Sequence, residues 1–153
     1  MIDTKFIGTA LPSHTADIER GRLRFFASVI GETDPVYTSL DAARAAGHPD
    51  LPVPPTFFFS LDLEQPGGFG GYLAEMGVDL RRVLHGEQSF TYHAMAYAGQ
   101  SLTLRSTITD IYAKKGGALE FIVRDTAVTH AADGSPVADL RSVVVVRNLE
   151  AGA

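Results

Sequence analysis

The chain changes character once, near residue 82, and this change constrains its fold more than any other feature of the sequence. Before that point apolar residues recur at helical spacing and are interrupted by glycine and proline, and after it they alternate with polar residues. Alternation is typical of strands with one buried face, and a 3.6-residue period is typical of amphipathic helices. The sequence therefore predicts an α+β fold, with helices first and an antiparallel sheet second.

Four strands are predicted after residue 82, with hairpin turns at Gly116-Gly117 and Asp133-Gly134. Each strand carries one apolar face. The apolar positions are Leu84, Phe90, Tyr92, Ala94 and Ala96 in the first strand, Leu102, Leu104 and Ile108 in the second, Leu119, Phe121, Val123 and Ala127 in the third, and Leu140, Val144 and Val146 in the last. His85 and His93 are predicted to share the opposite face of the first strand.

The segment Thr56 to Leu63 is apolar nearly all round, which is typical of a buried helix. A sheet with one apolar face needs a cover, and no other segment is apolar enough to provide it. Helix first, then long strands wrapped around it, is the order of elements in the hot-dog fold. Periodicity alone fits another α+β sandwich with the same elements equally well.

Three further helices are predicted. The first carries a buried stripe and ends at Gly31. The stripe consists of Leu23, Phe26, Ala27 and Ile30. A second helix begins at a capping box of Thr38 and Asp41, and Gly47 closes it. The glycine-rich stretch Gln65 to Gly71 is read as an interruption, and a last helical piece covers 72–76.

Composition excludes several classes of function. The formal net charge of −5 argues against nucleic acid, because phosphate binding needs a basic face. The absence of cysteine excludes disulfides, thiolate catalysis and Cys-type zinc sites. No run approaches the ~20 apolar residues that span a bilayer, and no signal-peptide pattern is present, so we expect a cytoplasmic protein with no membrane contact. The glycine-rich stretch lacks the Gly-Lys-Ser/Thr ending of a phosphate loop, and we predict no metal and no cofactor.

Several segments together resemble the MaoC-like dehydratases and R-specific enoyl-CoA hydratases. Those proteins carry Gly-Asp-x-Asn-Pro-x-His at the active-site entrance, then a short helix, a glycine and a proline-rich step into the hot-dog helix. The matching segments are Phe26 to Tyr37, Leu40 to Gly47, Pro54 to Phe57, and Leu84 to His93 with Gly99 shortly after. The resemblance covers nearly the whole chain and implies one hot-dog domain over residues 1–153.

The chain departs from this family at the catalytic dyad. In active members an aspartate and a histidine share the water that is added to, or removed from, an acyl thioester. Glu32 and Tyr37 occupy these two positions here, and Asp34 stands where asparagine is usual. Glutamate can serve as a base when burial raises its pKa, whereas tyrosine titrates near pH ~10 and is a poor proton shuttle. The pair is either a modified dyad or a remnant in which Asp34-Pro35 forms a turn and Tyr37 packs as an aromatic.

The resemblance also implies where a thioester binds. The implied substrate-binding residues are Asp34, Pro55, Thr56, Phe57, His85 and Gly86. The start of the helix at Pro55 to Phe57 is the expected place for a backbone N–H that holds the thioester oxyanion. The first strand is the edge along which hot-dog subunits pair, so His85 is either a group facing the substrate channel at that seam or a structural histidine.

The implied function is that of a hydro-lyase component in fatty acid metabolism, acting on an acyl-CoA or acyl-carrier-protein thioester. A degenerate dyad is typical of the substrate-holding subunit, so we expect a homodimer or a heterodimer with a catalytic hot-dog chain. Two alternatives stay open. One is a binding module without turnover, and the other is a hot-dog thioesterase with Glu32 or Glu87 as its base or nucleophile.

Overall fold

A five-stranded antiparallel sheet forms the body of the computed structural model, which describes residues 1–148. The strands lie in the spatial order β1-β3-β4-β5-β2. Their bounds are His14–Asp17 (β1), Val83–Tyr92 (β2), Ser101–Lys114 (β3), Leu119–His130 (β4) and Pro136–Arg147 (β5). The two predicted hairpins join β3 to β4 and β4 to β5. Strand β1 was not predicted, and β2 pairs with β5 rather than with β3, so β2 forms one edge of the sheet.

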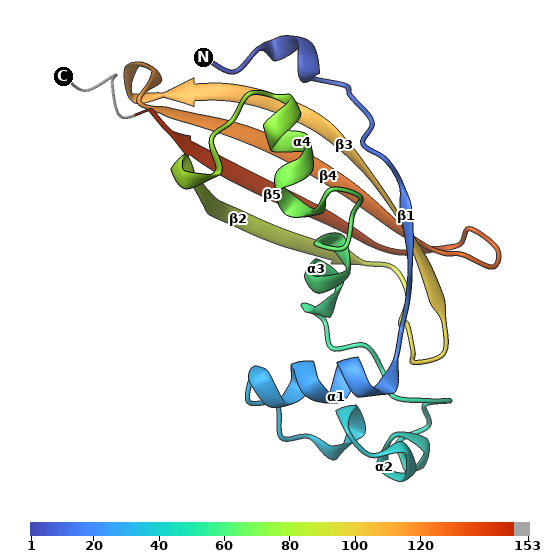
Figure 1. Ribbon diagram of the computed structural model, residues 1–153. Helices are drawn as coiled ribbons and strands as arrows, with labels where there is room; N and C mark the ends of the chain where they lie inside the picture. The colour runs from blue at the N-terminus through green and yellow to red at the C-terminus, as the bar shows by residue number, and fades with distance from the viewer. Residues whose placement is uncertain (149–153) are drawn as a thin grey trace.

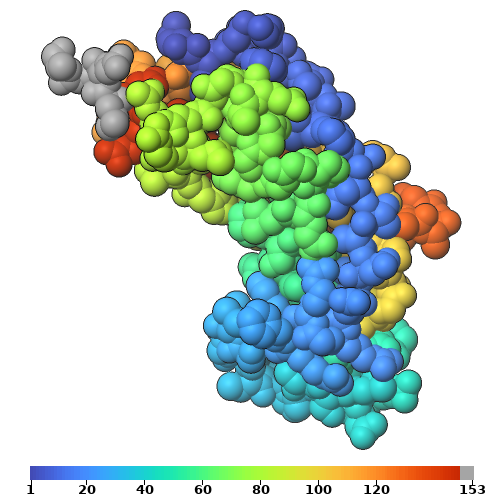
Figure 2. Space-filling view, viewed as in Figure 1, coloured from blue at the N-terminus to red at the C-terminus, as the bar shows by residue number. Residues whose placement is uncertain are grey.

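In the described part of the chain four α-helices accompany the sheet, at Arg20–Val29 (α1), Leu40–Ala45 (α2), Phe57–Asp62 (α3) and Gly68–Glu75 (α4). Helices α3 and α4 lie against one face of the sheet, while α1 and α2 form one end of the molecule (Figures 1 and 2). The predicted central helix is confirmed, because Phe57, Phe58 and Leu61 are buried between the sheet and the remaining helices. A long antiparallel sheet around this helix is the hot-dog architecture.

The helix boundaries differ from the prediction at three places. The cap of α2 is Ser39 rather than Thr38, and its hydroxyl accepts from the Ala42 N–H. Helix α4 begins at Gly68, because Gly67 adopts a left-handed φ of +80° that turns the chain directly into a new helix. Ile30 is 51% exposed because it lies past the last turn of α1 and leaves the buried stripe.

A bulge in β2 changes which side chains face the helices. The register with β5 shifts between His85 and Glu87, at Gly86. A Cβ atom on Gly86 would lie 2.7 Å from Val145 Cγ2 and 3.0 Å from the Val143 carbonyl oxygen, so a larger residue does not fit. Because one extra residue reverses the alternation, His85 faces α3 while Leu84 turns outward and is 50% exposed. The predicted shared face of His85 and His93 is therefore wrong.

Strand β4 turns toward the helices the face opposite to the one predicted to be buried. The side chains directed at the helices are Glu120, Ile122, Arg124, Thr126 and Val128, all buried. The predicted apolar set lies on the other side, where Phe121 stacks on Tyr112 at 4.7 Å. The charged residues tolerate burial because each has partners. Glu120, for example, accepts from the Ile2 N–H and from the Asn148 side chain.

No helix within residues 1–148 is both long and apolar enough to cross a membrane.

Candidate functional site

A pocket of about 330 Å³ opens where the end of β2 meets the segment leading into α3. It is lined by Tyr37, Val53, Pro55, Phe58, Tyr92, His93, Ala94, Met95 and Ala96. We call it the α3 pocket. Two of the predicted site residues, Tyr37 and Pro55, lie together in its wall although 18 positions separate them in the chain. The structure thus brings these two predicted residues together.

The α3 pocket has aromatic walls tied to the backbone. The Tyr92 hydroxyl donates to the Pro55 carbonyl oxygen at 2.9 Å, and its ring lies 6.0 Å from Phe58 and 5.9 Å from Phe90. Burial raises the pKa of Tyr92. His93 Nε2 bonds Asp139 Oδ2 at 2.7 Å. The pocket therefore offers apolar surface with a few fixed polar groups, as small-ligand sites do.

The loop at residues 32–37, which carries the two dyad positions, is held mainly by hydrogen bonds between its own residues. Glu32 Oε1 accepts from the Asp34 N–H at 2.8 Å, and Asp34 Oδ1 accepts from the Val36 N–H at 3.0 Å. Asp34 thereby caps a short 3₁₀ turn at Pro35–Tyr37. Glu32 does not line the α3 pocket, whereas Tyr37 does. The structure thus places the two dyad positions on one loop but only one of them in the pocket.

The start of α3 meets the oxyanion expectation only in part. Pro55 has no N–H, and the Phe57 N–H donates to the Pro54 carbonyl oxygen at 2.9 Å. Of the two N–H groups in this segment, that of the exposed Thr56 is the one not engaged in this turn. The Phe57 ring instead packs edge-on against Phe26 at 5.2 Å and lines a second pocket of about 390 Å³ beside α1.

His85 and Gly86 lie elsewhere on β2. The His85 ring stacks on Phe59 of α3, with 5.0 Å between ring centroids and 6° between planes. Gly86 forms the bulge that turns His85 toward the helix. Neither residue lines the α3 pocket.

Sequence reasoning did not single out Phe58, Tyr92 or Met95 as site residues. The alternation of the first strand placed Tyr92 on the apolar face correctly, but no local signal shows that its hydroxyl reaches Pro55. That contact spans 37 positions in the chain and exists only when β2 lies against the α3 segment.

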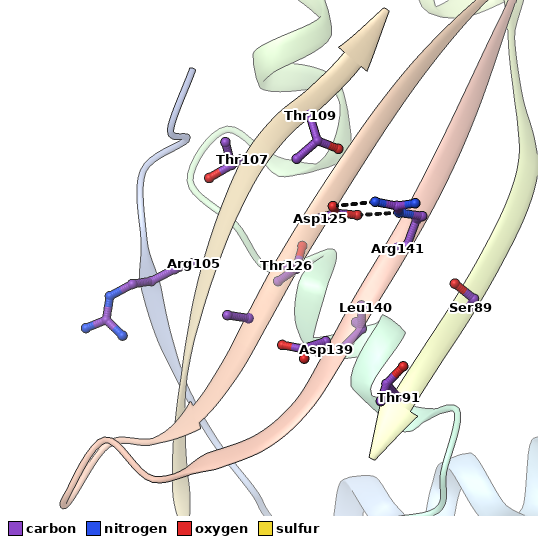
Figure 3. A pocket seen from close by; sticks show the side chains of 11 residues that line it. Ser89, Thr91, Arg105, Thr107, Thr109, Asp125, Thr126, Asp139, Leu140 and Arg141 are labelled. Carbon is purple, nitrogen blue, oxygen red and sulfur yellow. Dashed lines mark hydrogen bonds and ion pairs between the residues drawn. The ribbon is translucent and has the colours of Figure 1, made fainter. Parts of the chain in front are cut away.

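A larger hollow, of about 700 Å³, lies on the outer face of the sheet, away from the helices (Figure 3). Hydroxyl side chains dominate its floor, and two of its charged groups, Asp125 and Arg141, bond each other. Arg141 donates twice to Asp125, at 2.7 and 2.8 Å. A surface of this kind does not suit an acyl chain. Within residues 1–148 no three His, Asp or Glu side chains gather closely enough to hold a metal ion.

The five-stranded sheet around α3, with a pocket at the sheet edge, defines a hot-dog protein. The chain belongs to the family described as "FAS1-like, dehydratase domain region", whose model matches residues 5–140. It is 40% identical to a UPF0336 protein of Streptomyces coelicolor over 117 residues, which are 75% of this chain and 77% of that one. The predicted relationship to MaoC-like hot-dog dehydratases is confirmed.

Two solved structures of Mycobacterium tuberculosis proteins share the fold. One is the C-terminally truncated HadBC complex, a 3R-hydroxyacyl-ACP dehydratase, with a TM-score of 0.76, 22% identity, and coverage of 92% of this chain and 96% of that chain. The other is the ChsH1-ChsH2 complex, with a TM-score of 0.72, 20% identity, and coverage of 91% and 89%. Both structures are of complexes.

Proposed function

We propose that this chain is the acyl-thioester-binding subunit of a hydro-lyase, a 3-hydroxyacyl-thioester dehydratase or enoyl-CoA hydratase, and works with a catalytic hot-dog partner. The observation that carries this proposal is the state of the dyad positions. Glu32 is engaged by the Asp34 N–H of its own loop and stands outside the α3 pocket, and tyrosine replaces the histidine. A chain with this loop lacks a pair of groups that can exchange protons through one water.

The α3 pocket supports binding of an acyl thioester. Its walls come from Phe58, Tyr92 and Met95, and burying an acyl chain there contributes about 25 cal/mol per Å² of apolar surface. The hydrogen bond from the Tyr92 hydroxyl to the Pro55 carbonyl oxygen fixes this ring at the rim of the pocket. In this proposal the carrier is CoA or acyl-carrier protein.

Strand β2 supports the presence of a partner chain. It lies at the edge of the sheet, so one row of its backbone groups has no neighbour within residues 1–148. Leu84 and Tyr92 on this strand are 50% and 47% exposed. The α3 pocket opens at the end of the same strand. A second hot-dog chain paired along β2 would therefore complete the pocket wall and supply the missing dyad, and a homodimer would use the same edge.

A hydration assay tests the proposal. Crotonyl-CoA is offered to the purified chain alone, to the chain mixed with a hot-dog dehydratase chain that carries an intact aspartate–histidine dyad, and to that partner alone. We expect hydration only in the mixture, and we expect Glu32→Gln to leave the rate of the mixture within about twofold. Glu75→Gln, an exposed change on α4, is the matched control.

The other outcomes separate the alternatives. Hydration by the chain alone, abolished by Glu32→Gln, would establish a working modified dyad and overturn the proposal. Release of free CoA would indicate a thioesterase. Binding of crotonyl-CoA without hydration in any mixture would indicate a binding module.

A further inference from the structure

A belt of polar side chains crosses the inner face of the sheet beneath α3 and α4. It consists of Ser106 on β3, Arg124 and Thr126 on β4, Ser142 on β5 and Gln88 on β2. These residues are register partners on neighbouring strands. The hydroxyls of Ser106 and Thr126 bond at 2.8 Å, and the Ser142 hydroxyl donates to Gln88 Oε1 at 2.5 Å. The belt is therefore continuous across four strands.

The helical layer contributes side chains that interact with Arg124 of the belt. Asp62, the last residue of α3, forms an ion pair with Arg124, and both side chains are at most 1% exposed. Arg124 also donates to Gln65 Oε1 at 3.0 Å, and its guanidinium lies 5.2 Å from the centre of the Tyr72 ring. Burying a charged pair at this depth carries a large desolvation cost.

Three donors around Arg124 have no partner within residues 1–148. They are Arg124 Nε, Gln65 Nε2 and the Tyr72 hydroxyl, all buried. Buried donors in proteins are nearly always bonded, and leaving one unpaired is unfavourable. Arg124 contacts both Gln65 and the Tyr72 ring, so these three donors lie on neighbouring side chains.

The belt also separates two apolar clusters of core side chains, which we call the first and second compartments. The first contains Phe57, Phe58 and Leu140 and adjoins the α3 pocket. The second, beneath α4, contains Leu73 and Val144. An apolar ligand that enters the first compartment meets the belt before it reaches the second.

Two rows of side chains lead from the α3 pocket to the belt. On β2, Tyr92, Phe90 and Gln88 lie on one face, so four residues of strand, ~13 Å, join the pocket wall to the belt. On α3, Phe58 and Asp62 are one helical turn apart, on the same side. A tail lying between α3 and β2 therefore starts at Phe58 and Tyr92 and ends at Asp62 and Gln88.

We infer that the polar belt selects the acyl chain, an inference that rests on the proposed thioester-binding function. An entirely apolar tail is accommodated only as far as the belt, because further burial would leave Arg124, Gln65 and Tyr72 against hydrocarbon. A longer tail is accepted when it carries a hydroxyl or carbonyl oxygen at the depth of the belt. Asp62, Gln65, Tyr72 and Arg124 are the specificity-determining residues.

Binding of alkyl-pantetheine thioethers of increasing length, measured by calorimetry, tests this inference, since pantetheine is common to both carriers. In the native chain the Kd should fall by about fourfold per methylene and then reach a plateau or rise. In Asp62→Leu/Arg124→Met the decrease should continue past that length, because the pair is replaced by apolar groups of similar size. Asp125→Leu/Arg141→Met, which removes the same residue types from the outer face, should keep the native plateau.

A second measurement needs no variant. Among probes longer than the plateau, one with a hydroxyl at the depth of the belt should bind the native chain at least fivefold more tightly than its alkyl counterpart. Equal affinities for the two probes, or an unchanged plateau in a folded inner-pair variant, would overturn the belt inference and leave thioester binding intact. Failure of every probe to bind would instead overturn the proposed function as well.

Discussion

The two faces of the sheet each carry an aspartate–arginine pair, and the two pairs stand in very different surroundings. Arg124 and Asp125 are consecutive residues of β4, so their side chains point to opposite faces. Arg124 pairs with Asp62 under the helices, where both side chains are at most 1% exposed. Asp125 pairs with Arg141 in the outer hollow, where the side chains are 38% and 58% exposed (Figure 3).

The two pairs contain the same residue types, so their different burial accounts for their different pKa shifts and for their different tolerance of losing a partner. In the inner pair, burial raises the pKa of Asp62 although the charge of Arg124 opposes the shift. In the outer pair, hydrogen bonds from Arg141 lower the pKa of Asp125. The inner pair is therefore intolerant of losing one partner, whereas solvent replaces either partner of the outer pair.

The largest expected effect is that of Arg124→Met. It leaves Asp62 buried without its partner and should lower the free energy of unfolding by about 3–5 kcal/mol. Urea denaturation measures this. Arg141→Met is the matched control and should cost less than ~1 kcal/mol. The double variant Asp62→Leu/Arg124→Met should recover most of the loss, and similar losses for the single and double variants would contradict this account.

Gly86→Ala should have the next largest effect, about 1–3 kcal/mol, because its Cβ atom would meet Val145 and the Val143 carbonyl. This change probes the bulge that separates the inner and outer side chains of β2. Ser89→Ala, at an exposed position of the same strand, should stay within ~0.5 kcal/mol. An equally small loss for Gly86→Ala would mean that β2 tolerates a side chain at the bulge.

A third ion pair, Arg20 with Asp50, is intermediate in solvent exposure, since its side chains are 47% and 17% exposed. Hydrogen bonds from Arg20 lower the pKa of Asp50 to about 2. A lowered pKa stabilises the fold above the ordinary value of 3.8, and this contribution is lost as the pH falls from about 4 through about 2. Asp50→Asn should therefore cost about 0.5–1 kcal/mol at pH 6 and less at pH 3, measured by urea denaturation at each pH. A difference that grows on acidification would contradict it.

The smallest effect is expected from Asp125→Leu/Arg141→Met, which removes the outer pair. Its free energy of unfolding should change by less than ~0.5 kcal/mol at 0.15 M salt, because exposed pairs are screened. A loss comparable to that of Arg124→Met would remove the distinction between the two faces.

Much of the fold follows from local patterns. The apolar run at Thr56 to Leu63 predicted α3, and the alternation after residue 82 predicted β2 to β5 together with both hairpins. The order of these elements, with the segment Phe26 to Tyr37, predicted the family. Part of the α3 pocket was also predictable, because Tyr37 and Pro55 belong to segments that match the family.

The sequence by itself determined the elements and their order, and it placed Glu32 and Tyr37 where the resembling family has aspartate and histidine, since each of these depends on residue types at short spacing. Only the tertiary structure decided which face of β4 is buried and where β2 reverses its faces. An apolar pattern predicts that Phe121 and Val123 face the helices, but Arg124 faces them instead because Asp62 and Gln65 meet it from 62 and 59 positions away. Burial of a charge depends on such distant partners, and no local spacing encodes them.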